Sequence, residues 1–311
     1  MSRQNFKNFS SVILNKGPLL IVMAAILWGV DGVIRRSLLT LPPIIIVFYE
    51  HLLGAAILSL VAWPSLLKLK LTKKIVGLTL AISILSGLLG TLWFTSALVK
   101  VNFIAFSVVF LLQKLQPIFA VTAARIFLKE KITKQYLWWA GLALVAAYFV
   151  TFPSGSVNLS TGTGTVVAAL LALGAAAAWG ISTVFSKMLL AETTHTQATA
   201  LRFFTTTIMA LVAVVVMGQA SMILTPDLTQ VFRFGFIAVS TGMVALWIYY
   251  KGLKQTQAKI STILELVFPF LAVTIDAFLY KTVLAPTQYL AAAVLLFAIY
   301  RVGKLQNSSL N

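Results

Sequence analysis

Apolar runs of about 20 residues recur along the whole chain, and each is long enough to cross the hydrocarbon core of a bilayer as a helix. Of the 311 residues, 60% are hydrophobic and 10% are charged, against about 45–50% and about 25% in soluble domains. No polar stretch is long enough for a separate soluble domain. The sequence therefore predicts an all-α polytopic membrane protein. Its ten expected transmembrane helices lie near residues 17–38, 43–63, 75–97, 102–125, 135–152, 164–188, 196–218, 230–251, 257–280 and 285–303.

The basic residues predict the orientation of these helices. Ten spans put both termini on one side of the membrane, and 17 Lys and Arg residues flank the spans on that side, against 5 on the other. The positive-inside rule then places both termini in the cytoplasm, in an inner or plasma membrane. Because the basic residues lie between the apolar spans, they explain the net charge of +17 as membrane anchoring. We expect no nucleic-acid partner.

The chain contains an internal repeat. Trp-Gly occurs at 28–29 and 179–180, Pro at 117 and 269, and Gln-Tyr-Leu at 135 and 288. Each half holds five expected spans, an odd number, so the halves are inverted relative to each other. Such inverted repeats are typical of secondary transporters. The expected organisation is a cytoplasmic segment (1–16), a first repeat (17–152), a linker (153–163), a second repeat (164–303) and a cytoplasmic tail (304–311).

The two Trp-Gly pairs and the segment PIFAVTAARIFLKEKITKQYLWWAG (117–141) resemble the drug/metabolite transporter superfamily in its EamA-type, ten-helix form. The resemblance extends from about residue 17 to about residue 303. It implies export or uptake of a small organic solute, in a family that carries amino acids, amines and other metabolites. The second half departs from the pattern, with Thr282 where Glu130 aligns.

From these features we expect a secondary transporter that works by alternating access and moves an amine, an amino acid or a related metabolite, with or without proton coupling. The alternative is a membrane-embedded enzyme or scaffold whose intramembrane carboxylates are catalytic or structural. Motifs such as HExxH, GxSxG and Walker A are absent, and the chain has no Cys. The expected partners are the solute, the bilayer and protons. No cofactor or metal is expected, and one chain carries both repeats.

Charged residues inside the spans are the first candidates for function, because a charge at bilayer depth is costly without a partner or an aqueous cavity. Trp28, Asp31 and Arg35 share one helix face. Asp31 either pairs with Arg35 or faces the cavity. We expect Asp31 and Glu50, with the neighbouring His51, to take part in proton coupling.

The remaining candidates are polar or aromatic residues expected at cavity depth. Glu265 and Asp276 share a polar stripe on the ninth span, and the intramembrane cations Lys114 and Arg202 could hold an anion or neutralise a carboxylate. Pro117 and Pro269 are expected hinges. The substrate-binding residues that we expect are Trp28, Asp31, Glu50, Trp93, Gln113, Gln116, Trp179, Ser182, Trp247, Tyr250 and Glu265. The fifth and tenth spans are expected outside the substrate path.

Overall fold

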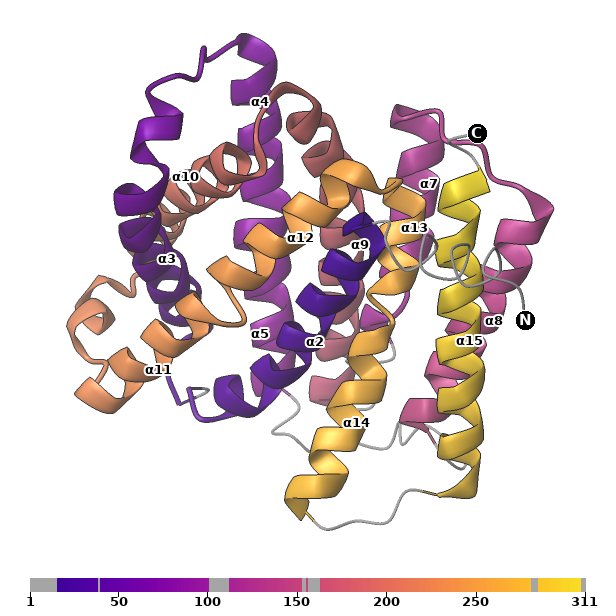
Figure 1. The fold of residues 1–311 in the computed structure, drawn as a ribbon. Coiled ribbons are helices and arrows are strands. Elements are labelled where there is room, and N and C mark those ends of the chain that lie inside the picture. The colour runs from indigo at the N-terminus through magenta and orange to yellow at the C-terminus, as the bar shows by residue number, and fades with distance from the viewer. Residues whose placement is uncertain are drawn as a thin grey trace.

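The computed structural model describes residues 16–38, 40–100, 112–152, 155, 163–280 and 285–308, and this part of the chain is helical (Figure 1). Most of the expected N-terminal segment and linker lies outside the described residues, as do residues 102–111 of the fourth span and 309–311 of the expected tail. The helices of the first half are α2 (Lys16–Arg36), α3 (Pro43–Leu66), α4 (Lys73–Ile82), the π-helix η1 (Ser83–Gly90), α5 (Thr91–Lys100), α7 (Gln116–Phe127) and α8 (Lys134–Thr151). Those of the second half are α9 (Thr163–Glu192), α10 (His195–Val216), the short 3₁₀ helix η2 (Ala220–Leu224), α11 (Leu228–Val239), α12 (Met243–Gln255), α13 (Ala258–Leu264), α14 (Val267–Tyr280) and α15 (Pro286–Ser308).

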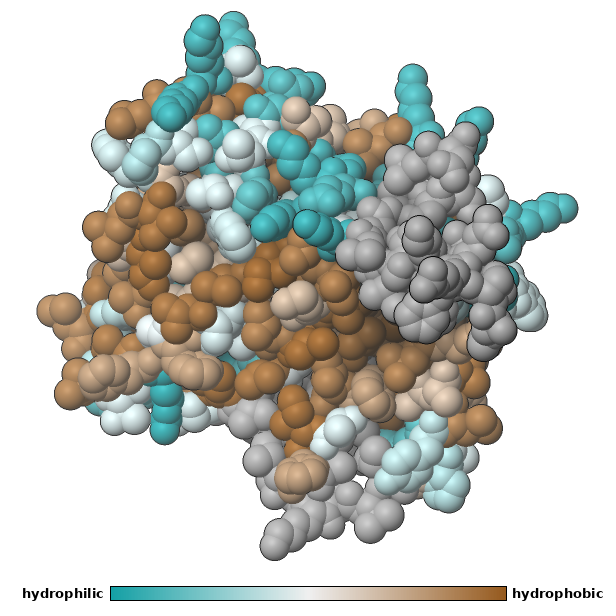
Figure 2. Space-filling view, in the orientation of Figure 1, coloured by the Kyte–Doolittle hydropathy of each residue, from teal (hydrophilic) through white to brown (hydrophobic). Residues whose placement is uncertain are grey.

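Six helical stretches of the described chain are long and apolar enough to cross a membrane. They are Pro43–Leu66, Lys73–Lys100, Val166–Glu192, His195–Val216, Leu228–Gln255 and Pro286–Leu305. On the face that Figure 2 shows, apolar residues are spread across the middle of the molecule, and hydrophilic residues gather above them. Large apolar side chains of the described chain are exposed, such as Leu60 (82%) and Val216 (79%), as expected where lipid is the solvent. The protein is therefore an integral membrane protein.

The helices of one half pack on those of the other in matching pairs. When the halves are superposed in sequence, α2 corresponds to α9, α3 to α10, the α4–α5 stretch to α11–α12, α7 to α13–α14, and α8 to α15. Helix α3 packs on its counterpart α10, and α8 packs on its counterpart α15. Helix α2 contacts α12 and α14, while α9 contacts α5 and α7, which are the corresponding helices of the other half. The two-repeat architecture is thus present in the packing as well as in the sequence.

Helices α8 and α15 lie side by side at one flank of the bundle (Figure 1). The side chain of Trp138 on α8 is 69% exposed. Trp139 packs edge-on against Phe297 of α15 and under the guanidinium of Arg301, with ring centroids 5.6 Å apart for the aromatic pair. The two tryptophans of α8 therefore face the periphery and the neighbouring helix α15.

The fourth and ninth predicted spans are interrupted at corresponding positions, whereas the sequence predicts each as one helix. Proline has no backbone N–H, so it cannot donate to the carbonyl four residues before it. Before Pro117, Leu115 N bonds Leu112 O (3.1 Å), and before Pro269, Leu266 N bonds Ile263 O (3.1 Å). In both places the N–H bonds the carbonyl three residues earlier instead of four, which tightens the backbone. The regular helices resume just before the prolines, α7 at Gln116 and α14 at Val267. The hinge role of these prolines stays a prediction.

Candidate functional site

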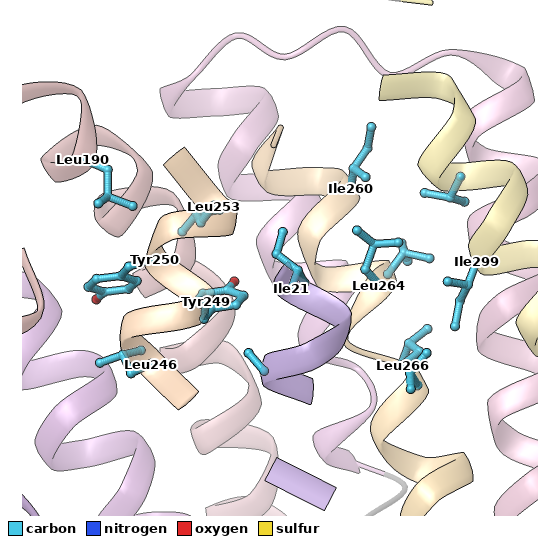
Figure 3. Packing of buried hydrophobic residues seen from close by; sticks show 14 of the residues in the cluster. Ile21, Leu190, Leu246, Tyr249, Tyr250, Leu253, Ile260, Leu264, Leu266 and Ile299 are labelled. Carbon is cyan, nitrogen blue, oxygen red and sulfur yellow. The ribbon is translucent and has the colours of Figure 1, made fainter. Parts of the chain in front are cut away.

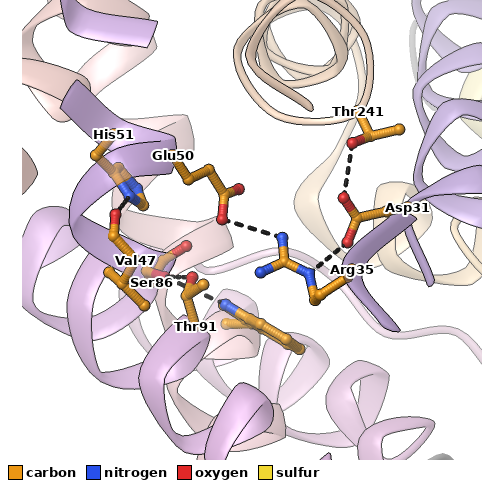
Figure 4. Close-up of polar contacts among 9 residues, drawn as sticks. Asp31, Arg35, Val47, Glu50, His51, Ser86, Thr91 and Thr241 are labelled. Carbon is orange, nitrogen blue, oxygen red and sulfur yellow. Dashed lines mark hydrogen bonds and ion pairs between the residues drawn. The ribbon is translucent and has the colours of Figure 1, made fainter. Parts of the chain in front are cut away.

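A buried ionic cluster joins α2, α3 and the turn between α11 and α12 (Figure 4). Arg35 Nε donates to Asp31 Oδ2 (2.6 Å), and Arg35 Nη2 donates to Glu50 Oε2 (3.0 Å). Thr241 donates its hydroxyl to the other oxygen of Asp31 (2.6 Å). Arg35 and Glu50 are 5% and 9% exposed. Asp31 and Glu50, the carboxylates expected to take part in proton coupling, are thus both paired with Arg35.

His51 follows Glu50 in sequence but makes different contacts. Its Nδ1 lies 2.8 Å from the carbonyl oxygen of Val47, and its ring lies 5.1 Å from that of Phe203 on α10. The residue is 3% exposed. Its hydrogen bond is therefore to its own helix, and the carboxylate of Glu50 points instead to Arg35 (Figure 4). The proposed relay between these neighbours has no direct contact among the described residues.

A second polar group lies where the interrupted fourth and ninth spans meet. Tyr249 of α12 donates its hydroxyl to Glu265 Oε1 (2.7 Å), and Gln116 of α7 donates Nε2 to Glu265 Oε2 (3.0 Å). The ring of Trp28 on α2 lies 5.2 Å from the ring of Tyr249. Trp28, Gln116 and Glu265 are partly exposed although they lie between helices. We call these four residues, Trp28, Gln116, Tyr249 and Glu265, the joint cluster.

The joint cluster combines hydrogen-bonding groups with an aromatic surface. Tyr249 and Tyr250 are neighbours on α12 and point to different sides of it, Tyr249 toward α2 and α13 and Tyr250 toward Leu190 (Figure 3). Tyr249 was not among the residues expected from the sequence, whereas Tyr250 was. The sequence showed the aromatic pair but not which ring would face the carboxylate, because that depends on the rotation of α12.

Tyr250 belongs to a third polar group on the other side of α12. Its hydroxyl lies 2.9 Å from Ser186 Oγ and accepts a hydrogen bond from Arg202 Nη1 (3.2 Å). Ser186 and Arg202 correspond in the repeat to Arg35 and Glu50, so the second half replaces the ionic pair by a serine, a tyrosine and an arginine. Arg202 forms no ion pair among the described residues.

The other expected site residues lie apart from the joint cluster. Trp179 donates Nε1 to Ser86 O (3.3 Å) and packs on Phe94, and both partners belong to the third predicted span. This contact corresponds in the repeat to that of Trp28 with Tyr249, which belongs to the eighth predicted span. Trp247 donates to Thr196 Oγ1 (3.0 Å). Three further residues do not contact Glu265 through a hydrogen bond in the described structure. They are Trp93, which approaches Gly174, the partly buried Gln113, and Ser182, whose hydroxyl is buried without a partner among the described residues. Lys114 donates to Thr151, and the side chains of Pro269 and Asp276 lie outside the described residues.

The glycines of the two Trp-Gly pairs allow close helix contact. A methyl group on Gly180 of α9 would lie 2.7 Å from the carbonyl oxygen of Gln116, and one on Gly29 of α2 would lie 3.1 Å from Leu271 Cβ of α14. Each glycine therefore allows the first helix of its own repeat to pack closely on the proline-containing helix of the other repeat, α9 on α7 and α2 on α14. The repeated Trp-Gly was visible in the sequence, but only the packing shows that its glycine positions the joint cluster.

Glu130 has a contact that the sequence did not predict. Its two carboxylate oxygens accept hydrogen bonds from the backbone amides of Ala258 (2.8 Å) and Lys259 (3.1 Å), the first residues of α13. A carboxylate at this place satisfies amides that a helix start leaves without partners. The loop after α7 is thus fastened to the helix that leads to Glu265.

Comparisons with known proteins agree with this architecture. The model of the EamA-like transporter family matches twice, at residues 15–152 and 166–303. The riboflavin transporter ImpX of Fusobacterium nucleatum is 36% identical over 293 residues, which cover 93% of this chain and 98% of that protein. The uncharacterized transporter YvbV of Bacillus subtilis is 27% identical over 176 residues, which cover 54% of this chain and 53% of that protein.

A solved crystal structure of another protein has the same fold, with a TM-score of 0.75 over 94% of this chain and 98% of that one, at 16% identity. At this identity the match concerns the fold alone. Because the family model covers both halves of the chain, and because the packing repeats between those halves, this protein belongs to the EamA-like transporter family and is a transporter of small molecules.

Proposed function

We propose that the chain is a secondary transporter with ten transmembrane helices in two inverted five-helix repeats, residues 17–152 and 164–303, and with both termini in the cytoplasm. The excess of basic residues on the terminal side of the spans supports this orientation. Alternating access then consists of a change in how the two repeats contact each other. Pro117 and Pro269 lie at corresponding interruptions and are the proposed bending points.

We infer that the substrate is a small organic solute with a planar ring, and riboflavin is the first candidate. The observation that carries this proposal is the joint cluster, in which the ring of Trp28 lies 5.2 Å from Tyr249 and the hydroxyl of Tyr249 contacts Glu265. Interrupted helices that supply polar groups between repeats are typical of transporter binding sites. The 36% identity to a riboflavin transporter supports a flavin as the ring compound.

An amine or amino acid is the second candidate class. Glu265 accepts hydrogen bonds from Tyr249 and Gln116 and forms no ion pair among the described residues, so a substrate ammonium group would supply its missing positive charge. The remaining expected contacts, Trp93, Gln113, Trp179, Ser182, Trp247 and Tyr250, are proposed to line other parts of the path. Asp31 and Glu50 are proposed to contribute to the path through the buried ionic cluster that they form with Arg35.

Uptake into proteoliposomes tests this proposal. Riboflavin is fluorescent, so its accumulation in vesicles containing the purified protein can be compared with that in empty vesicles. We expect riboflavin uptake that saturates as its concentration rises. Uptake of radiolabelled amines or amino acids, without uptake of riboflavin, would favour the second class. Vesicles with the protein that are no more permeable than empty vesicles to any of these compounds would contradict the proposal.

A further inference from the structure

We propose that Glu265 is the proton-binding group of the transport cycle and that its protonation releases the hydrogen bond between the two interrupted helices. The proposal rests on the proposed function, because it assigns a coupling ion to a secondary transporter. It differs from the assignment expected from the sequence, in which Asp31, Glu50 and His51 carry the proton.

Glu265 differs from Asp31 and Glu50 in whether a cation compensates its charge. Asp31 and Glu50 both bond Arg35, so protonating either one weakens an existing ion pair. Removing one partner of a buried pair is strongly destabilising because it leaves a buried charge without compensation. Glu265 has only neutral donors, Tyr249 and Gln116, among the described residues. Its proton therefore neutralises a charge that no cation compensates, and no ion pair is lost.

The neighbouring titratable groups have other partners. Helix α13 packs on α2, α7, α8, α9 and α15, and Glu265 also contacts α12. On these elements the titratable side chain that touches Glu265 in the described structure is Tyr249. The others are engaged elsewhere: Tyr136 with the Lys259 carbonyl, Lys259 with the Lys131 carbonyl, Lys187 with the Leu253 and Lys254 carbonyls, Tyr148 with Gly155, Tyr250 with Ser186 and Arg202, and Arg301 with the Trp139 ring. Lys254 bonds the Thr193 carbonyl, Glu192 pairs with Lys74, and Asp31 pairs with Arg35. Lys16 and Lys134 begin α2 and α8, and the remaining groups are exposed: Arg125, Lys251, Tyr289, Tyr300 and Lys304.

The position of Glu265 links its charge to the contact between repeats. It directly follows α13, at the interruption before Pro269, and its partner Gln116 begins α7, at the interruption in the other half. These two residues are 149 positions apart in the chain. A change at Glu265 therefore acts on a hydrogen bond between the two interrupted helices.

Protonation changes this bond because of the donors and acceptors involved. An ionised carboxylate only accepts hydrogen bonds, and those it accepts are stronger than neutral ones. When a proton from the aqueous phase binds Oε2, the charge of the group changes from −1 to zero and Oε2 becomes a donor. The amide group of Gln116, which now presents Nε2, must turn to offer its oxygen, or the bond is lost. The proton leaves when Glu265 next faces water.

Infrared spectroscopy of the protein in lipid gives a test that needs no substrate. The carbonyl stretch of a protonated carboxyl group is distinct from that of a carboxylate. The other carboxyl groups of the chain also give this band, so the signal of Glu265 is the difference between wild-type protein and Glu265→Gln. We expect the wild-type band to grow as the pH is lowered, and Glu265→Gln to lack one component of it. Glu192→Gln, which removes an exposed carboxylate paired with Lys74, is the matched control and should keep that component. Identical bands in wild-type protein and Glu265→Gln at every pH would overturn the proposal.

Transport then tests coupling. In vesicles with an imposed pH gradient, we expect Glu265→Gln to lose roughly 5- to 150-fold of the gradient-driven accumulation. Glu265→Asp keeps an acid at this place and should retain gradient-driven transport with a changed pH profile, which also guards against a folding defect in the Gln variant. Wild-type transport that ignores the gradient would refute the coupling role but leave the proposed function intact. Absence of riboflavin transport alongside a titrating Glu265 would refute the proposed substrate alone.

Discussion

Gly180 lies so close to Gln116 that a methyl group on Gly180 would be 2.7 Å from the Gln116 carbonyl oxygen. This contact joins the first helix of the second repeat to the start of α7, at the same residue that bonds Glu265. Two of the opposing atoms are backbone atoms, the Gln116 oxygen and the Ala120 nitrogen at 2.9 Å, and the third is Phe119 Cβ at 2.9 Å. Rotation of a side chain moves none of them, so it does not relieve the overlap.

Gly180→Ala should therefore destabilise the protein by about 1–3 kcal/mol, the usual cost of overpacking a close contact. Thermal unfolding in detergent measures this as a lower midpoint. Gly77→Ala is the control, because nothing lies within 4 Å of a methyl group there and Ala favours the helix. Equal midpoints for the Gly180 variant and the wild type would show that α7 and α9 separate easily.

Arg35→Gln should destabilise the protein more than Asp31→Asn or Glu50→Gln. The arginine variant leaves two buried carboxylates without a cation, whereas each carboxylate variant leaves Arg35 paired with the other acid. Breaking a buried pair costs about 3–5 kcal/mol, so we expect the arginine variant to aggregate in detergent on size-exclusion chromatography. The reverse order of stability would show that the cluster is not held by charge.

Asp31→Asn and Glu50→Gln also distinguish the two assignments of the coupling proton. If Glu265 binds the proton, both variants keep the wild-type dependence of transport on pH. If the expectation from the sequence holds, each folds but loses most of its pH-dependent transport. Initial rates measured in vesicles over a pH series, in comparison with Glu265→Gln, decide between these outcomes.

Glu130→Gln should weaken the start of α13 by about 0.5–2 kcal/mol, the range for losing a helix cap. The charged carboxylate accepts the amides of Ala258 and Lys259, and a neutral amide accepts them less strongly. Hydrogen exchange followed by mass spectrometry should show faster exchange in residues 258–264. Glu192→Gln serves as the control, because its ion pair with Lys74 is exposed. Unchanged hydrogen exchange in Glu130→Gln would show that Glu130 does not stabilise the start of α13.

Trp28→Phe should raise the KM for a ring-shaped substrate roughly 2- to 10-fold, since an aromatic pair contributes about 0.5–1.5 kcal/mol. Trp138→Phe is the matched control, because its side chain is 69% exposed on α8. Uptake kinetics of riboflavin in proteoliposomes measure both. An equal effect of the two substitutions would place the aromatic contact outside the substrate site.

The sequence by itself determined that this is a helical membrane protein built from two repeats. The reason is physical, since a hydrocarbon core requires about 20 apolar residues per crossing helix and leaves no backbone polar group without a partner. The paired Trp-Gly and proline positions also indicated where the halves correspond. The prolines predicted bending points in the fourth and ninth spans, but each span was expected as one helix, so the interruptions before the prolines were not predicted.

The tertiary structure decided which charges meet. Asp31 and Arg35 are four residues apart on one helix, so their pairing was among the sequence alternatives, whereas the bond from Arg35 to Glu50 requires the packing of α2 beside α3. Gln116 and Glu265 meet only because the two repeats pack against each other at their interruptions. Residues so distant in the chain are brought together by helix rotation and close glycine contacts. A periodicity along one helix contains no information about which partner faces it.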